Sequence, residues 1–302
     1  MSRVKKPGKR ATAEMHQQYR EASKQKNLSR RFVDMGRQLR NELDEAGGQR
    51  KILVLTGDGS FCNRTCFGEI PERSVLLVRA RKNSKLCFPA SEGSRRFYGV
   101  DKFTPEQVRV DEKRAWKATK VFYGGKRRKI YYKVVDSVLW ETGAKRRPLR
   151  LIVVRATPYR KSQSKKLYYR EPAYLLTTDR NSSLKQLLQI YFDRWQIEVN
   201  HREEKDTLGV GQAQLWNINS VPKQPVLVVA AYSALLLASL RAFGPERGDA
   251  YAPLPKWRRN ARRPSCLDLV TLLRKEVAEL QNNNHRLELS ITPQALVGAA
   301  AA

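Results

Sequence analysis

The chain has 302 residues, of which 41% are hydrophobic, so it can build a packed core and is not a disordered chain. Lysine and arginine total 59 against 29 acids, which gives a formal net charge of +30 and predicts a polyanionic partner. The four cysteines form no CxxC pair and lie at no zinc-ligand spacing from the three histidines. This usage excludes a zinc module and a disulfide scaffold, and it indicates a reducing compartment.

The amino-terminal third predicts a basic arm followed by the first part of a core domain. Residues 1–28 are basic and polar, with no apolar stretch after Met1, so we expect no secretory signal and a cytosolic location. Within the core segment 29–85, apolar spacing predicts an amphipathic helix over 29–46 that is capped by Ser29. Leucine-rich and β-branched runs at 51–60 and 74–82 predict strands of a sheet that is covered on both faces.

Residues 86–172 have a different pattern. Short β-prone segments are separated by Gly, Pro and basic turns, which predicts an antiparallel β-rich insertion. Ten lysines and arginines and no acid lie between Lys145 and Arg170, interleaved with tyrosines. This mixture is typical of phosphate contacts combined with base stacking. A solvated face on a twisted sheet is the alternative.

The core pattern returns over residues 173–245. A strand is predicted at 173–178, followed by one long helix that begins near Ser183 and ends at Gly209. The apolar run 226–240 is shorter than the roughly 20 residues of a membrane span, so it predicts a buried helix. Residues 246–302 are predicted to form a basic linker and a C-terminal helix.

The long helix changes from apolar to polar along one face. Tyr191, Glu198 and Lys205 are seven residues apart and therefore share that face, and Arg194 lies between the first two. Charged residues on a core-facing stripe cost desolvation free energy, which favours a functional role. A surface ion pair between Arg194 and Glu198, on a helix that emerges from the core, is the alternative.

This spacing resembles the YREK signature of bacterial insertion-sequence DDE transposases, and RWQIEVNHREEK is similar to it over its whole length. Residues 54–86 resemble the strand, Asp, helix and strand segment that carries the second catalytic Asp of that family, and the match falls on Asp58. The resemblance spans residues 29–243. It implies an α/β fold with an RNase H-like core that lacks its first strands, is interrupted by the β insertion and is followed by C-terminal helices.

The resemblance implies a DNA transposase that cleaves and transfers DNA strands with the help of Mg²⁺ or Mn²⁺. Asp58 and Glu198 would be the catalytic metal ligands, since acidic oxygens are the ligands that Mg²⁺ prefers. Tyr191, Arg194 and Lys205 would hold DNA phosphates. The implied partner is double-stranded DNA at transposon ends, bound by a homodimer at the nucleoid of the bacterial cytosol, with no membrane partner.

Some relatives stack an unpaired base on a tryptophan of the insertion, for which Trp116 and Trp140 are the candidates here. Burial in the sheet is the alternative for both.

The resemblance fails at the first catalytic Asp, which should follow the opening strand of the sheet. No such strand precedes Ser29. Asp179 is not the missing ligand, because the helical rise places Glu198 about 22 Å from Ser183, so we expect Asp179 to be a strand-end or capping residue. We therefore expect the C-terminal part of a longer transposase, which binds DNA and cleaves it weakly or not at all alone. A non-catalytic basic nucleic-acid-binding protein is the alternative, and an RNA-associated protein is the third, disfavoured because no RRM or KH signature is present.

Overall fold

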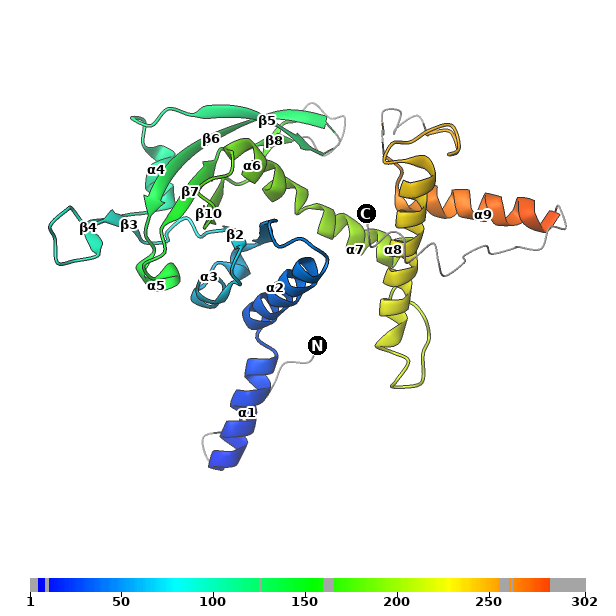
Figure 1. Cartoon of the computed structure of the whole chain (residues 1–302), viewed down its shortest axis with the longest axis horizontal. Helices are drawn as coiled ribbons and strands as arrows, with labels where there is room; N and C mark the ends of the chain where they lie inside the picture. Colours follow the sequence, from blue (N-terminus) through cyan, green and yellow to red (C-terminus); the bar gives the residue numbers. More distant parts are fainter. Residues whose placement is uncertain are drawn as a thin grey trace. The chain divides into compact units, whose positions relative to one another are not determined.

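A computed structural model describes residues 5–8, 11–124, 126–159, 166–255, 261 and 263–282 (Figure 1). The chain divides into two compact units, Met1–Arg194 and Trp195–Ala302. The first unit is a mixed α/β fold built on a six-stranded sheet. The described part of the second unit contains helices and their connections.

The sheet of the first unit has the strand order β1-β2-β10-β7-β6-β5. In that order the strands are Leu53–Gly57, Ser74–Arg79, Ala173–Thr177, Leu149–Val154, Lys126–Val138 and Lys117–Tyr123. β1 and β2 are parallel, and the other neighbours in the sheet are antiparallel. The predicted strands are therefore confirmed, and the antiparallel strands of the insertion extend the same sheet.

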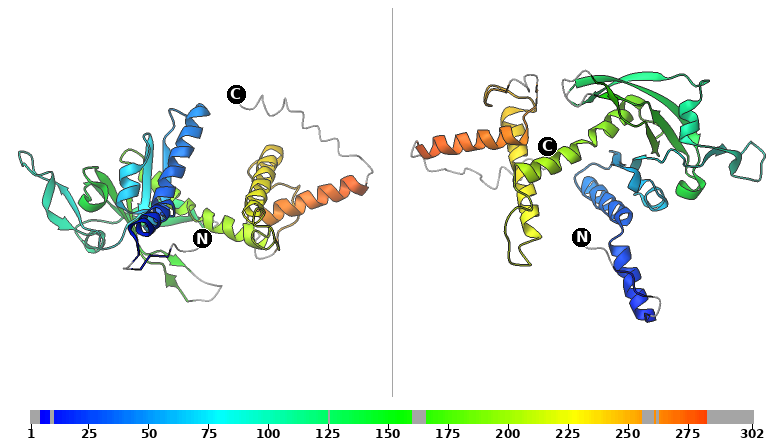
Figure 2. Two further views of the ribbon diagram at one scale, coloured as in Figure 1. Left: turned by 90° about the horizontal axis from the view of Figure 1, so that it is seen from below. Right: turned by 180° about the vertical axis from the view of Figure 1, so that it is seen from behind.

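Helices cover both faces of this sheet, as the continuous apolar runs predict (Figures 1 and 2). Adjacent residues of β2 separate the two cores: Leu76 packs in the core that includes Val33 and Phe67, and Leu77 packs in the core that includes Leu187. The first core is covered by α2 Leu28–Glu45, α3 Arg64–Glu69 and α4 Pro105–Val110, and the second by α6 Leu184–Asp193.

The helix predicted over residues 29–46 is confirmed as α2, with a different cap. The side chain of Asn27, rather than that of Ser29, accepts hydrogen bonds from the first-turn N–H groups of Ser29 and Arg30. Asn is as good an N-cap as Ser, and the observed cap lies two residues before the predicted one. The preceding basic arm contains a helix of its own, α1 Ala13–Gln25.

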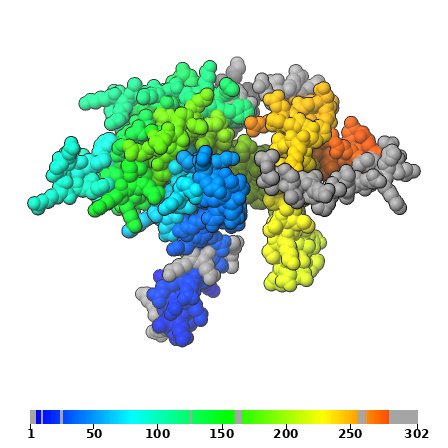
Figure 3. Space-filling model, viewed as in Figure 1, coloured from blue at the N-terminus to red at the C-terminus, as the bar shows by residue number. Residues whose placement is uncertain are grey.

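Short elements complete the first unit. They are α5 Glu141–Ala144 and two small hairpins, β3 Leu86–Pro89 with β4 Tyr98–Phe103, and β8 Pro158–Tyr159 with β9 Tyr168–Tyr169. The cyan β3–β4 hairpin projects from the unit in the space-filling view (Figure 3). The β8–β9 hairpin lies between β7 and β10 in the chain, within the basic, tyrosine-rich stretch.

The single helix predicted from Ser183 to Gly209 is wrong in its continuity. The structure has α6, which ends at Asp193, and α7 Gln196–Asp206. Arg194 and Trp195, which connect them, keep right-handed helical dihedral angles. The periodicity of the sequence predicts the two helices but not the division of the chain into units at this point.

The burial predicted for the apolar run 226–240 is also wrong. The run lies in α8 Lys223–Phe243, and of its residues only Ser239 is buried, bonded through its hydroxyl to Tyr251 at 2.8 Å. A helix that is apolar on all sides needs cover on all sides, and α9 Cys266–Asn282 and the loop around Tyr251 supply only part of it. By length and composition alone α8 could cross a bilayer, a test that core helices of soluble proteins also pass.

Candidate functional site

Asp58 stands at the carboxyl end of β1, as predicted. Its carboxylate accepts a hydrogen bond from the Ser60 N–H at 2.8 Å and caps the short 3-10 helix Gly59–Phe61. Because Gly57 pairs with Val78 in the parallel β1–β2 ladder, the next residues along the two strands, Asp58 and Arg79, lie at the same edge of the sheet. An exposed carboxylate and an exposed guanidinium thus share this edge.

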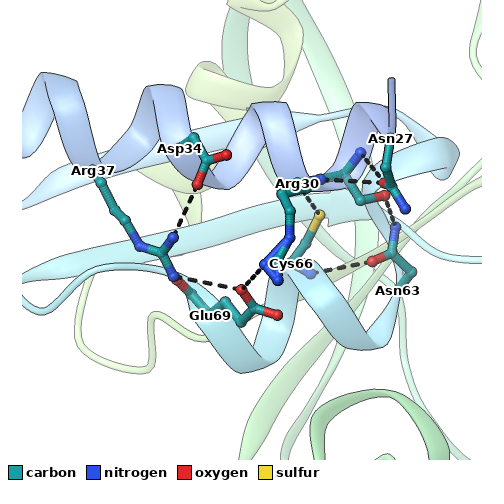
Figure 4. Close-up of polar contacts among 8 residues, drawn as sticks. Asn27, Arg30, Asp34, Arg37, Asn63, Cys66 and Glu69 are labelled. Carbon is teal, nitrogen blue, oxygen red and sulfur yellow. Dashed lines mark hydrogen bonds and ion pairs between the residues drawn. The ribbon is translucent and has the colours of Figure 1, made fainter. Parts of the chain in front are cut away.

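The loop that follows Asp58 is fixed by Asn63 (Figure 4). The Asn63 amide nitrogen donates to the Ser29 hydroxyl at 2.7 Å and to the Ser60 carbonyl at 2.8 Å. Its oxygen accepts from the Cys66 N–H at 3.1 Å, which caps α3. One side chain therefore connects α2, α3 and the residue whose N–H holds the Asp58 carboxylate.

Ion pairs add to this connection between α2 and α3. The Glu69 carboxylate lies 3.4 Å from Arg30 and 3.5 Å from Arg37, and Arg37 also lies 2.9 Å from Asp34 (Figure 4). Exposed pairs of this kind contribute little free energy each, so their effect is mainly on the orientation of α3.

The loop after Asp58 also contains Cys62. Burial, followed by the charge of Cys66, raises the pKa of the Cys62 thiol to about 12, so this thiol stays protonated.

Tyr191, on α6, lies in the same unit as Asp58 and is partly buried against the second core. Burial raises the pKa of its hydroxyl, and the charges of Arg79, Arg194 and Arg170 act in the opposite direction. The hydroxyl therefore stays protonated and can donate a hydrogen bond, and three arginines contribute to its electrostatic environment. Two of these, Arg79 and Arg170, are residues that the sequence did not single out.

Arg170 lies near two tyrosine rings. Its guanidinium lies 5.3 Å from the ring centroids of both Tyr123 and Tyr159, and Tyr123 in turn packs on Phe192 at 4.8 Å. The basic, tyrosine-rich composition of residues 145–170 was the signal for such a surface. For Arg79 no local signal exists, because a polar residue at a strand end is ordinary.

Glu198 and Lys205 lie on α7, in the first and last turns. Both are exposed, and their separation of seven residues places them two turns apart on one face of the helix, with His201 and Arg202 between them. An acid in the first turn and a base in the last both complement the helix dipole. Glu198 belongs to the second unit and Asp58 to the first, so their convergence on a common metal ion stays a prediction.

Asp179 lies just after the end of β10, which confirms the strand-end role that was one of its two predicted roles, while Ser183 is the N-cap of α6. Asp179 is buried, and its carboxylate accepts from the N–H groups of Asn181 and Ser182, both at 2.9 Å. Burial opposes its ionisation, but these hydrogen bonds and the charge of Arg150 hold its pKa below the usual range. Because β10 runs antiparallel to β2, Asp179 lies at the sheet edge opposite to Asp58, and the two cannot share a metal ion.

The two candidate tryptophans of the insertion have different environments. Trp140 packs edge-on against Phe67 at 5.7 Å and fills the space beside Gly143, where a Cβ would lie 2.1 Å from the ring. Trp116 instead lines a pocket of about 470 Å³, whose other residues include four cations, Arg109, Arg114, Lys133 and Arg155. Trp140 therefore has a packing role. Trp116 also packs partly on the first core, with Lys133 Nζ 4.6 Å from its ring centroid, and it borders this cationic pocket.

Known proteins offer little comparison. No protein-family model matches the chain, and no curated protein matches it. Among solved structures, the chain is similar to the cryo-EM structure of the piggyBac transposase synaptic complex with hairpin DNA (SNHP), with a TM-score of 0.32 and 12% identity. The alignment covers 88% of this chain and 44% of that chain, so it spans less than half the length of the transposase. A similarity of this size does not establish a shared fold.

Proposed function

We propose that this protein is a DNA-binding protein of the DDE transposase type with an RNase H-like core. One observation carries the proposal: Asp58, at the carboxyl end of β1, shares a sheet edge with Arg79, whose charge acts on Tyr191 together with that of Arg194. An acid at a strand end beside a phosphate-binding cluster is the arrangement that phosphoryl transfer needs. The spacing of Tyr191, Arg194, Glu198 and Lys205 supports the same proposal.

Double-stranded DNA is the proposed partner because the chain is strongly basic. The formal net charge is +30, and guanidinium groups bind phosphates with two parallel hydrogen bonds. Arg194 would hold a phosphate in this way, and Lys205 would act as a point charge. In the proposed reaction two chains bind two DNA ends at the nucleoid.

The proposed metal ions are Mg²⁺ or Mn²⁺, held by Asp58 and Glu198. Carboxylate oxygens fit these ions, and Mg²⁺ often takes only one or two protein carboxylates, with water and phosphate oxygens as its other ligands. When bound, such ions supply an activated nucleophile and charge neutralisation at the phosphate. The chain's own part is orientation: the Ser60 N–H fixes one oxygen of Asp58.

A non-catalytic nucleic-acid-binding protein is the second candidate. Its support is the strong positive charge of the chain, because the binding of phosphates by lysine and arginine needs no metal site. Both candidates predict salt-dependent binding of DNA, so a salt titration does not separate them. A measurement of metal binding by Asp58 and Glu198 separates the two candidates.

The test combines metal binding with DNA binding. Mn²⁺ binding to the whole chain with DNA present is measured by electron paramagnetic resonance, for the wild type and for Asp58→Asn and Glu198→Gln. We expect both variants to lose Mn²⁺ and any strand cleavage while they retain DNA binding, and Glu92→Gln, on the β3–β4 hairpin, to behave as the wild type. Unchanged Mn²⁺ binding in both variants would overturn the metal-dependent function. The non-catalytic nucleic-acid-binding protein would then be the remaining candidate. Loss of DNA binding in Glu198→Gln would assign that residue a structural role.

A further inference from the structure

The strands β5 and β6 present an exposed face on the side of the sheet opposite to α6. They form the long ribbon at the top of Figure 1, and α6 packs on their other face. We propose that the exposed face binds a single strand of nucleic acid, with bases stacked on its aromatic rings and phosphates held by its lysines and arginines. The proposal goes beyond the proposed function, because it needs neither a metal ion nor strand cleavage.

Alternation along the two strands determines which residues lie on this face. Val121 and Ile130 are buried in the core that α6 covers. Side chains one position away point to the opposite face, and the exposed residues there form the β5–β6 face: Ala118, Lys120, Phe122, Arg127, Lys129 and Tyr131. The antiparallel register joins them in three direct pairs, Phe122 with Arg127, Lys120 with Lys129, and Ala118 with Tyr131.

The central pair of the β5–β6 face brings two lysines opposite each other. Like charges in a cross-strand pair destabilise a sheet, and Lys120 and Lys129 are direct partners. Among the described residues of β5, and of β6 as far as Lys133, there is no acid that could compensate the two charges. A bound polyanion would remove the repulsion, so this pair favours a phosphate ligand over an apolar protein partner.

Aromatic rings lie on both sides of the lysine pair. The Phe122 side chain is 47% exposed and that of Tyr131 is 37% exposed. They are two rows of pairs apart, which is about 13 Å along the strands at about 3.3 Å per residue. Exposed rings that alternate with cations are the combination that binds single strands with little sequence preference. In a duplex the bases already stack on one another, so the rings favour a single strand.

The β5–β6 face ends at Arg155, just after β7. The Arg155 N–H donates to the Tyr131 carbonyl at 2.9 Å, and its guanidinium lies 5.8 Å from the Tyr131 ring and 6.0 Å from the Trp116 ring. Beyond it, Lys133 is buried and donates to three backbone carbonyls at the end of α4, at 2.7 to 3.3 Å, so it holds the fold rather than a ligand. Glu112 also lines the pocket beside Trp116 and would oppose an anion there.

A purely solvated surface is the competing explanation. Lys129 Nζ lies 5.1 Å from the Tyr131 ring, and with Arg155 it could serve only to cover that ring by cation–π contacts. Such a surface would have no affinity for a single strand. The experiment must therefore separate binding from stability.

Fluorescence anisotropy of a labelled oligothymidylate of about ten nucleotides, titrated with the whole chain, tests the rings. Phe122→Leu and Tyr131→Leu keep an apolar side chain but remove the ring. We expect each to weaken binding about 5- to 150-fold, which corresponds to the loss of one stacked base. Phe122→Tyr should bind as the wild type. Phe88→Leu removes a ring of similar exposure, 42%, on β3 and should leave the affinity unchanged.

The lysine pair is tested by salt dependence and thermal unfolding together. Lys120→Gln should reduce the slope of log affinity against log salt by about 0.7, the value for one phosphate contact with a single strand. The same variant should unfold at a higher temperature than the wild type, because the repulsion from Lys129 is removed. Arg50→Gln removes an exposed charge before β1, at the far edge of the sheet, and should leave the slope unchanged.

A duplex of the same sequence and an oligouridylate complete the comparison. Loss of single-strand affinity in the leucine variants, with duplex affinity unchanged, supports the β5–β6 face, and tighter binding of oligouridylate would support it with RNA as the ligand. If the wild type binds the duplex but not the single strand, or if the ring and lysine variants match their controls, this proposal is wrong while the proposed function stands. Single-strand binding without duplex binding would support this proposal and overturn the proposed function.

Discussion

The side chain of Gln189 on α6 forms two hydrogen bonds with the backbone of Phe122 on β5. Its Oε1 accepts from the Phe122 N–H at 2.8 Å, and its Nε2 donates to the Phe122 carbonyl at 2.9 Å. Because β5 is the last strand of the sheet, these backbone groups would otherwise lie on an open edge. Gln189 takes the place of a further strand there, and it fixes the helix that carries Tyr191 two residues later.

Gln189→Glu should weaken this junction. The introduced carboxylate can still accept from the Phe122 N–H, but at neutral pH it cannot donate to the carbonyl, and it lies near Asp193. We expect a loss of about 0.5–1.5 kcal/mol in the free energy of unfolding, measured with urea, because one exposed hydrogen bond is replaced by repulsion. Lys185→Gln, on the exposed side of the same helix, is the control and should change stability by less than about 0.5 kcal/mol. Equal stability of the two variants would show that the edge contact is unimportant.

The side chain of Asn63 should stabilise both the loop after Asp58 and α3. Asn63→Asp keeps an acceptor for the Cys66 N–H but removes the donor to Ser29 and Ser60. We expect Asn63→Ala to cost about 1–2 kcal/mol, because it also loses the helix cap, and Asn63→Asp to cost less. Hydrogen exchange at the Ser60 N–H should be faster in both. Protection of that N–H in Asn63→Asp would contradict the role of the amide donor.

Stability in acid should depend on Glu106. Its carboxylate is bound by the Arg109 guanidinium, with Nη2 at 2.6 Å from Oε1, and by the Tyr174 hydroxyl, and these contacts lower its pKa to about 2. Since the folded-state pKa is below the unfolded one, the contribution is present above about pH 4.3 and is lost as the pH falls toward 2. Unfolding free energies over this range should fall more steeply for the wild type than for Glu106→Gln. Parallel curves would show that the pair is fully screened by solvent.

Removal of the carboxylate charge should have opposite effects at Asp179 and Asp58: it should lower stability at Asp179 and abolish metal binding at Asp58. Asp179→Asn keeps an oxygen acceptor for Asn181 and Ser182, so it should retain Mn²⁺ binding and any cleavage with a modest loss of stability. Asp58→Asn should lose Mn²⁺ binding with little change in unfolding free energy, because the residue is exposed. The comparison requires both quantities on the same preparations. Loss of metal in Asp179→Asn alone would place the ligands at the other edge of the sheet.

The sequence predicted the elements whose signal is local. The run at 51–60 and the run at 74–82 became β1 and β2, and the position of Asp58 after β1 is confirmed, because β-branched runs and helical periodicity depend on neighbouring residues only. The β-rich character of residues 86–172 is confirmed for the same reason.

The arrangement in space could not be predicted in the same way. Arg79 reaches the carbonyl of Pro172 because β10 pairs with β2, a contact across 93 positions of sequence that no local pattern encodes. The break between α6 and α7 and the exposure of α8 depend on which surfaces meet, and hydropathy reports only that a surface is apolar. In the sequence Gln189 resembles any exposed helix residue, so no local pattern indicates its hydrogen bonds to Phe122.

The pairing of β2 with β10 also affects how the chain is made. The Leu76 N–H donates to the Thr178 hydroxyl across 102 positions of sequence, so a nascent chain on the ribosome exposes one side of β2 until the whole insertion has emerged. That side is an apolar, unpaired strand edge during synthesis. A nascent chain stalled before Ala173 should therefore require chaperones, and slower translation upstream of this point should not relieve the requirement.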